Sequence, residues 1–257
     1  MIITLTTDFG LRDAYVASMK GVILGINPRA TLVDICHHIE PQGITQAAFV
    51  LETAHRYFPP GTIHVVVVDP GVGTERRALL LKTPSALFVA PDNGVLSYII
   101  EEAGPESEAI HLTNSGYWHH PVSTTFHGRD IFAPVAAHLS LGTPPHEFGE
   151  PFSSPLTFPI PRPTWAADGT LHGHILHIDA FGNLITDVKA QDLAPGQVVI
   201  EVGGERIEGL SHTYGGDEKL LAIIGSSGYL EVAAPNKNAA SLLAAKIGDP
   251  IKIGKGP

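Results

Sequence analysis

Disulfide bonds are excluded within this chain, because its 257 residues contain a single cysteine, Cys36. A chain without disulfides fits a reducing compartment. The first residues, MIITLTTDFG, have neither the basic region nor the apolar region of a secretory signal. We therefore expect a cytoplasmic protein.

Positive charge is also scarce: 16 Lys and Arg stand against 26 Asp and Glu, for a formal net charge of −10. The sequence has no block of Lys or Arg, so we expect neither nucleic acid nor an anionic membrane as a partner. No apolar run is long enough to span a bilayer. Acidic pockets would suit a cationic small molecule, and that class of ligand stays open.

The motifs of several common chemistries are missing. The sequence has no GxxxxGK[ST] phosphate loop, no GxGxxG opening a helix after the first strand, no GxSxG nucleophile elbow, and no HExxH, CxxC or EF-hand pattern. His172 and His174 would share one face of a strand while His177 points to the other, which leaves two ligands, too few for a closed zinc site. We expect neither a metal nor an organic cofactor.

What is present is organised around the segment IHVVVVDPGVGTERR, residues 63–77. Its β-branched run, 63–68, predicts a strand buried on both faces, which is typical of a parallel sheet. Asp69 lies at the carboxyl end of this strand, where α/β sheets bind ligands. The following PGVG predicts an open turn, and Arg76 lies in the same loop. A carboxylate is thus placed beside a guanidinium, either as a functional pair or as a structural pair that locks the turn.

Strands and helices alternate along residues 1–143, which predicts an α/β domain with a mostly parallel sheet and helices on both faces. Strands are expected at residues 2–6, 31–35, 63–68, 79–81, 87–90 and 109–112, with 79–81 and 87–90 joined in a hairpin around residues 83–85. Helices are expected at residues 13–26, with Asp13 as the cap, and at 43–58, 95–102 and 131–141.

The composition changes after residue 143. Residues 144–163 contain seven prolines in twenty positions, which predicts an extended linker because proline disfavours both helices and central strands. Residues 164–257 predict a smaller, all-β domain, a barrel or a sandwich. Its strands are expected at 170–179, 197–202, 220–225, 229–232 and 250–253, with a helix at 238–245.

Polar clusters follow several of the expected strands. They are Asp8 with Asp13, Asp69 with Arg76, Asp92 with Asn93, the run TFHGRD at 125–130, and the run DAFGN at 179–183. Each cluster alone has an ordinary structural explanation, such as a turn, a helix cap or a buried histidine. Because the carboxyl ends of parallel strands meet at one edge of a sheet, their joint placement favours a common site.

The motifs together resemble a known family. They are TTDFGLRDAYV, VDICHHI, VVVVDPGVGTERR, APDNGVLS, TFHGRDIFAPVAAHL, DAFGNLITD and GSSGYLEVA followed by KNAA. Over essentially the whole chain, the sequence resembles the S-adenosyl-L-methionine (SAM) hydrolases that form adenosine and methionine. These enzymes are also called SAM hydroxide adenosyltransferases and are related to the fluorinases and chlorinases. The combination of DPGVGTxR with FHGRDxFAP is the specific part of the match.

The resemblance implies attack of water, as hydroxide, on the ribose C5′ of SAM, with methionine leaving as a neutral thioether. The family's catalytic Asp, Arg and His fall on Asp69, Arg76 and His127. Water needs a positioned base and stabilisation of the developing negative charge. His127 with Asp69 would accept or relay the proton, and Arg76 would hold the hydroxide-like oxygen. Which of Asp69 and His127 is the proximal base is left open.

The resemblance also assigns substrate contacts, with the pocket including Phe126. Asp8 is expected at the ribose hydroxyls, Asp13 and Asp179 at the methionine ammonium, and Ser226 or Ser227 at the methionine carboxylate. Asn183 and the backbone of Ala239 are expected at the adenine, with Phe181 or Tyr214 packed on its ring. At Ser227 or Gly228 the halogenating relatives carry an arginine, and Gln42 replaces one of their tryptophans.

Two other features follow from the resemblance. The family forms a homotrimer whose sites lie between the first domain of one subunit and the second domain of its neighbour. The halogenating relatives carry a small hydroxyl residue where this chain has Gly128, which favours water over halide. The alternatives are a chloride transferase that uses SAM and a non-catalytic protein that binds adenosine or SAM.

Overall fold

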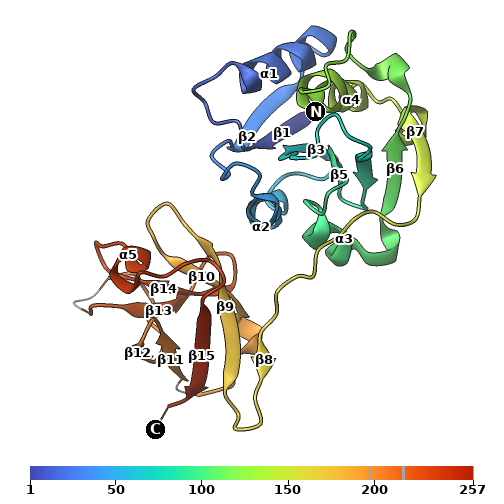
Figure 1. The fold of residues 1–257 in the computed structure, drawn as a ribbon. Helices are drawn as coiled ribbons and strands as arrows, with labels where there is room; N and C mark the ends of the chain where they lie inside the picture. The colour runs from blue at the N-terminus through green and yellow to red at the C-terminus, as the bar shows by residue number, and fades with distance from the viewer. Residues whose placement is uncertain (197, 216–217, 257) are drawn as a thin grey trace. The chain divides into compact units, whose positions relative to one another are not determined.

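The computed structural model describes residues 1–196, 198–215 and 218–256. The chain forms two compact units, Met1–Pro159 and Ile160–Pro257 (Figure 1). Each unit is built around one sheet. Within the described ranges, none of the helices has the length and hydropathy needed to cross a bilayer.

The N-terminal unit contains a seven-stranded sheet in the order β2-β1-β3-β5-β4-β6-β7. Its strands are β1 (Ile2–Thr7), β2 (Thr31–Cys36), β3 (Thr62–Val67), β4 (Ala78–Lys82), β5 (Ala86–Pro91), β6 (Glu108–Leu112) and β7 (Gly149–Phe152). Its α-helices are α1 (Tyr15–Ile26), α2 (Ile44–His55), α3 (Ser97–Ala103) and α4 (Ala133–Ser140).

The sheet is mixed, so the prediction of a mostly parallel sheet is only partly right. The pairs β2–β1, β1–β3 and β3–β5 are parallel, whereas β5–β4, β4–β6 and β6–β7 are antiparallel. The reversal begins at the predicted hairpin, where residues 83–85 join β4 to β5. A parallel pairing would need a crossover of a dozen or more residues. The predicted ligand edge therefore exists only in the parallel half.

Strand β3 lies at the centre of that half, and all six of its residues are buried. Its alternate side chains point to opposite faces. Ile63, Val65 and Val67 pack in one core with residues of α1 and α4, whereas Val66 packs in a second core with residues of α2 and α3. Helices thus cover both faces of the sheet, as predicted (Figure 1).

Two predicted helix starts are wrong. Helix α1 begins at Tyr15 with Ala14 in the N-cap position, so Asp13 lies outside the helix and does not cap it. The helix predicted from Ile131 begins earlier, because Gly128–Phe132 forms a π-helical turn that runs into α4. Turns of this kind are frequent at functional sites, and this one directly follows His127.

The predicted linker begins too early. A short 3-10 helix, Pro145–Phe148, and strand β7 occupy its first half, and β7 pairs with β6 at the edge of the sheet. An edge strand tolerates Pro151, since one side of its backbone has no partner strand. Asp92 then accepts a hydrogen bond from the Leu156 N–H at 2.7 Å, which ties this segment to the N-terminal unit.

The C-terminal unit contains an eight-stranded sheet in which every neighbouring pair is antiparallel. Its elements are β8 (Thr164–Trp165), β9 (Leu171–Ile178), β10 (Leu184–Lys189), β11 (Val198–Val202), β12 (Glu205–Glu208), β13 (Leu221–Ile224), β14 (Tyr229–Ala233), α5 (Ala239–Leu243) and β15 (Pro250–Lys255). The order is β12-β11-β15-β9-β10-β14-β13, with β8 paired to β9. Among the described residues the two end strands do not pair, so the sheet is not a closed barrel.

The sequence predicted five of these strands and missed β8, β10 and β12. Strand β10 contains Thr186 and Asp187, both buried, which interrupt the apolar pattern of a strand. The predicted start of β11, Gln197, lies outside the described residues. The core of this unit gathers alternate residues of the strands, such as Leu230 and Val232 of β14.

Candidate active site

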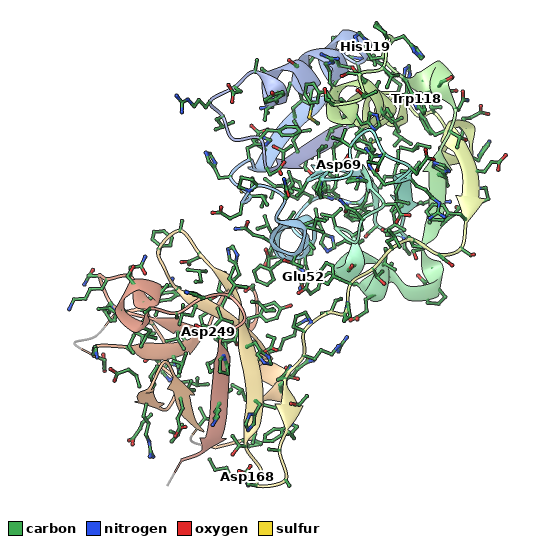
Figure 2. The ribbon with its side chains drawn as sticks, viewed as in Figure 1. Glu52, Asp69, Trp118, His119, Asp168 and Asp249 are labelled. Atoms are coloured by element: carbon green, nitrogen blue, oxygen red, sulfur yellow. The ribbon has the colours of Figure 1, made fainter. Side chains whose placement is uncertain are left out.

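Asp69, Arg76 and His127 form one connected group in the N-terminal unit. Asp69 lies just beyond the end of β3 (Figure 2). Arg76 Nε donates to Asp69 Oδ1 at 2.9 Å and to Oδ2 at 3.0 Å, and a second guanidinium nitrogen also contacts Oδ2. The same terminal nitrogen lies 2.7 Å from His127 Nδ1. The guanidinium therefore bridges a carboxylate and an imidazole that are 58 positions apart in the chain.

Two glycines allow this approach. Gly73 has φ +76°, and a β-carbon there would lie 2.2 Å from the carbonyl oxygen of Thr124. The 70–76 loop therefore packs directly against the segment that carries His127. A β-carbon at Gly71 would lie 3.1 Å from Arg76 Cγ, so a small residue there also lets the arginine fold back over the loop.

The charged pair is shielded from water. The side chains of Asp69 and Arg76 are 5% and 9% exposed, and the guanidinium lies 5.3 Å from the centroid of the Phe132 ring. A salt bridge this buried is expensive to break, because removing one partner leaves the other charge uncompensated. The pair therefore fixes the loop and also holds a positive charge beside His127.

The imidazole of His127 is kept neutral. Burial lowers the pKa of His127 below its ordinary 6.5, and the positive charge of Arg76 lowers this pKa further. A guanidinium can only donate, so Nδ1 accepts its hydrogen bond and the proton of the neutral ring lies on Nε2. His127 thereby presents an N–H donor rather than a free lone pair at its other nitrogen.

Asp69 and His127 line a cavity of about 410 Å³ at the carboxyl ends of the parallel strands, whereas Arg76 is not part of its lining in the described chain. Its lining consists of Asp8, Phe9, Tyr15, Gln42, Val67, Asp69, Pro70, Val72, Thr125, Phe126, His127 and Gly128. Asp8 follows β1, and its Oδ2 accepts a hydrogen bond from the Gln42 N–H at 2.9 Å. Phe9, Tyr15 and Phe126 form an aromatic wall with centroid distances of 5.2–5.7 Å. The structure therefore brings Asp8 and Phe126 together with the Asp69–Arg76–His127 group.

Other polar clusters of the N-terminal unit do not line this cavity in the described chain. Asp13 is exposed ahead of α1. Asp92 is buried and accepts from Arg77 and from the Leu156 N–H, while Asn93 donates to the Val68 carbonyl at 2.8 Å. Both have the structural role that their turn sequence also allowed.

A second, larger pocket of about 690 Å³ lies in the C-terminal unit. It is lined by Asp179, Phe181, Asn183, Tyr214 and the run Ala233–Asn238. Asp179 Oδ1 accepts from the N–H groups of Phe181 and Asn183, and Oδ2 accepts from the Asn183 side chain at 2.9 Å. This bonding fixes the side-chain amide of Asn183 and, among the described residues, leaves its oxygen available as an acceptor.

The remaining predicted contacts of this unit lie beside that pocket. Ala239 is fully buried at the start of α5 and directly follows Asn238 of the lining. Ser226 and Ser227 lie in the turn between β13 and β14 and do not line the pocket in the described chain.

Glu231 is a residue that the sequence reasoning missed. It lies on β14, is 6% exposed, and accepts a hydrogen bond from the Tyr214 hydroxyl at 2.7 Å. Burial raises the pKa of Glu231, and the charge of Asp179 raises it further; the pKa of Tyr214 rises to about 12. The sequence signal that could have revealed Glu231 is its position as a charged residue inside the otherwise apolar strand YLEVA.

No metal centre is apparent in the part of the chain that the structure describes, since no three His, Cys, Asp or Glu residues gather as ligands there. His174, one of the two histidines considered for zinc, instead lies 3.5 Å from Asp187, a buried carboxylate of β10.

Comparison with known proteins gives consistent matches over the whole chain. The model of the SAM hydroxide adenosyltransferase N-terminal domain matches residues 3–149, and that of the C-terminal domain matches residues 173–252. The chain is 38% identical to an (R)-S-adenosyl-L-methionine hydrolase of Salinispora tropica, covering 99% of this chain and 98% of that protein. It is 29% identical to a fluorinase of Nocardia brasiliensis, covering 98% and 97%.

The fold matches solved structures as well. A conserved protein of Thermotoga maritima, described as uncharacterized, superposes with a TM-score of 0.91 at 38% identity, covering 99% of this chain and all of that one. A conserved hypothetical protein of Thermus thermophilus gives a TM-score of 0.79 at 35% identity, covering 98% and 99%. With both domain models matched in order, the chain belongs to the SAM hydroxide adenosyltransferase family.

Proposed function

We propose that the protein hydrolyses S-adenosyl-L-methionine to adenosine and L-methionine. One observation carries the proposal: Arg76 bridges Asp69 and His127, and both of these residues line a cavity that also contains Asp8. This arrangement presents hydrogen-bond donors to an oxygen and a carboxylate to a ribose in the same space. The names of the full-length relatives support the same reaction.

In the proposed step, a hydroxide-like oxygen attacks ribose C5′. The O–C5′ bond forms as the C5′–S bond breaks, and the electron pair of that bond turns the sulfonium into a neutral thioether. The leaving group needs no acid, so catalysis depends on placing the oxygen in line and stabilising its charge. Asp8 binds the ribose hydroxyls and fixes C5′.

The hydrogen bonds bear on whether Asp69 or His127 removes the proton from the attacking water. Both oxygens of Asp69 accept from Arg76, and His127 Nδ1 is also occupied. The lone pair of His127 Nδ1 is therefore taken, and the carboxylate of Asp69 is engaged by Arg76 at both oxygens. We propose that Arg76 and the His127 Nε2–H stabilise hydroxide, while the proton passes to solvent. The positive sulfonium and Arg76 both favour ionisation of the water.

The C-terminal pocket is proposed to hold the rest of the substrate. Phe181 and Tyr214 would pack on the adenine, and the free oxygen of Asn183 would accept from its exocyclic amino group. Family resemblance adds the Ala239 backbone at the adenine, Asp13 and Asp179 at the methionine ammonium, and Ser226 or Ser227 at the carboxylate. It also motivates the proposal of a cytoplasmic homotrimer, which sedimentation of the purified protein would test.

Chloride transfer is the second candidate, because fluorinases are among the relatives. The packing at Gly128 speaks against it: a β-carbon there would lie 3.3 Å from Met19 Sδ, from Phe126 and from Val67. A hydroxyl side chain at this position would force its neighbours to move. No cofactor is needed for the proposed reaction.

The test is incubation of the purified protein with SAM and separation of the products. Adenosine and methionine are the expected products, whereas 5′-chloro-5′-deoxyadenosine would indicate chloride transfer, and unchanged bound SAM a binding protein. The sulfonium sulfur is a stereocentre, and the relatives are named for its R form. We expect the R epimer to be consumed faster than the S epimer when the two are supplied separately.

A further inference from the structure

Glu231 is a buried acid that the proposed reaction leaves without a role. In β14 its side chain shares a face with Tyr229 and Ala233, while Leu230 and Val232 face the core. A buried carboxylate is costly unless it is hydrogen-bonded. Its Oε2 accepts from the Tyr214 hydroxyl at 2.7 Å.

The sequence makes room for this carboxylate at a third position. A β-carbon on Gly225 would lie 1.7 Å from Glu231 Oε1 and 2.2 Å from its carboxyl carbon. The carboxylate therefore occupies the space that any other residue at 225 would fill. The three positions come together from the loop before β13, the residue directly after β13, and strand β14.

Tyr214 needs such an anchor. It lies between β12 and β13, where residues 209–215 form neither helix nor strand. Backbone bonds hold the start of this stretch, from the Gly209 N–H to the Val198 carbonyl and from the Ser211 N–H to the Ala222 carbonyl. The hydrogen bond of the Tyr214 side chain is a further attachment, and Tyr214 is 48% exposed where it lines the pocket.

We propose that Glu231 is a positioning residue that holds the Tyr214 ring in place as a wall of the C-terminal pocket and thereby sets the affinity for the nucleoside end of the substrate. The inference rests on the proposed function for the identity of that substrate. The bond between Tyr214 and a carboxylate is of the stronger, charge-assisted kind. Burial of Glu231 against Gly225 keeps the acceptor fixed when the pocket is empty.

Steady-state kinetics of four variants test the inference. Glu231→Ala and Tyr214→Phe should each raise the KM for SAM roughly tenfold and leave kcat within roughly twofold. The double variant should be no worse than either single one, because both remove the same bond. Glu231→Gln keeps an acceptor oxygen but loses the charge, so it should raise KM less than Glu231→Ala does.

Gly225→Ala places a β-carbon where the Glu231 carboxylate lies, which should disrupt its bond to Tyr214. This variant should therefore raise KM as Glu231→Ala does. Gly254→Ala on β15 is its matched control, since a β-carbon there meets nothing within 4 Å. An unchanged KM in Glu231→Ala, additive effects in the double variant, or a loss in kcat alone would overturn the inference.

A second readout separates this inference from the proposed function. Amide hydrogen exchange of residues 209–215, measured without ligand, should accelerate in Glu231→Ala and Tyr214→Phe but not in Gly254→Ala. If the wild-type protein forms no adenosine, the proposed hydrolysis is wrong, yet the exchange rates still decide whether Glu231 holds this loop. Exchange unchanged in both variants rejects the positioning role whatever the reaction.

Discussion

The cavity of the N-terminal unit and the pocket of the C-terminal unit differ in how they present their polar groups. In the first, Asp69 and Arg76 are almost fully buried and bonded to each other and to His127. In the second, Phe181 lies in a turn and is 79% exposed. Rigid, desolvated charge is what a bond-breaking step requires, whereas exposed rings are suited to covering a flat ligand.

Burial acts on both sites in the direction of the neutral form. It lowers the pKa of His127 and raises that of Glu231. The consequence differs, because neutral His127 presents its N–H to the proposed nucleophile, while Glu231 acts one step away from the ligand through Tyr214. In the proposed function, the N-terminal cavity carries out the chemistry and the C-terminal pocket recognises the substrate.

The largest effect is expected in the N-terminal cavity. His127→Ala and Arg76→Ala should each lower kcat by roughly a hundredfold or more and change the dissociation constant for SAM only a few-fold, because both groups act on the nucleophile. His146→Ala, at an exposed position, is the control. If a variant has a normal kcat but binds SAM poorly, the residue that it replaces acts in substrate binding and not in the chemical step.

Asp69→Asn separates chemistry from scaffolding within the same group. The change keeps the shape and removes the charge that faces Arg76. If the charge serves catalysis, the variant should remain folded at the assay temperature and lose roughly a hundredfold in kcat, although its melting temperature falls because Arg76 loses its buried partner. Thermal melting and adenosine formation on one preparation measure both. If the variant is fully active but has a clearly lower melting temperature, the role of Asp69 is purely structural.

The dependence of activity on pH tests whether Arg76 lowers the pKa of His127. Neutral His127 is the active form and its pKa is lowered, so activity should fall on acidification with a midpoint below 6.5. Arg76→Gln removes the positive charge that helps to lower this pKa, so the acid limb of its residual activity should move to higher pH. An acid limb that stays in place in this variant contradicts the coupling.

A smaller effect, confined to binding, is expected in the C-terminal pocket. Phe181→Ala should raise the KM for SAM roughly fivefold and leave kcat within roughly twofold, because the ring contacts substrate and transition state alike. Exposed Trp165 in the same unit provides the control, as Trp165→Ala. A large fall in kcat for Phe181→Ala would contradict the claim that the C-terminal pocket acts only in binding.

Metal removal should have no effect. Treatment with EDTA followed by desalting is expected to leave the rate unchanged, and the rate is measured before and after addition of zinc or magnesium. Loss of activity that either ion restores would contradict the metal-free reaction and point first to His172 and His174.

Much of this division could be predicted from the sequence because it depends on local patterns. The valine run predicted buried β3, and its end predicted Asp69 at the ligand edge. The hairpin of β4 and β5 was predicted, but the antiparallel pairings of β6 and β7 were missed, since strand direction depends on how distant segments of the chain return to the sheet. Asp92 and Asn93 looked like site residues, but only tertiary contacts show that they hold Leu156 and the end of β3.

Glu231 and its partners show the same limit in the C-terminal unit. Tyr214, Gly225 and Glu231 are unremarkable one at a time in sequence. Their relation appears only when β13 and β14 pair and place the carboxylate beside the glycine. Long-range packing of this kind has no periodic signal in a single sequence.

The central claim is that the N-terminal cavity delivers an oxygen from water to C5′ of SAM. Turnover in water enriched in oxygen-18, followed by mass spectrometry of both products, tests it most directly. The account predicts one heavy oxygen in the 5′-hydroxyl of adenosine and none in methionine. Unlabelled adenosine, or label recovered in the methionine-derived product, would contradict it.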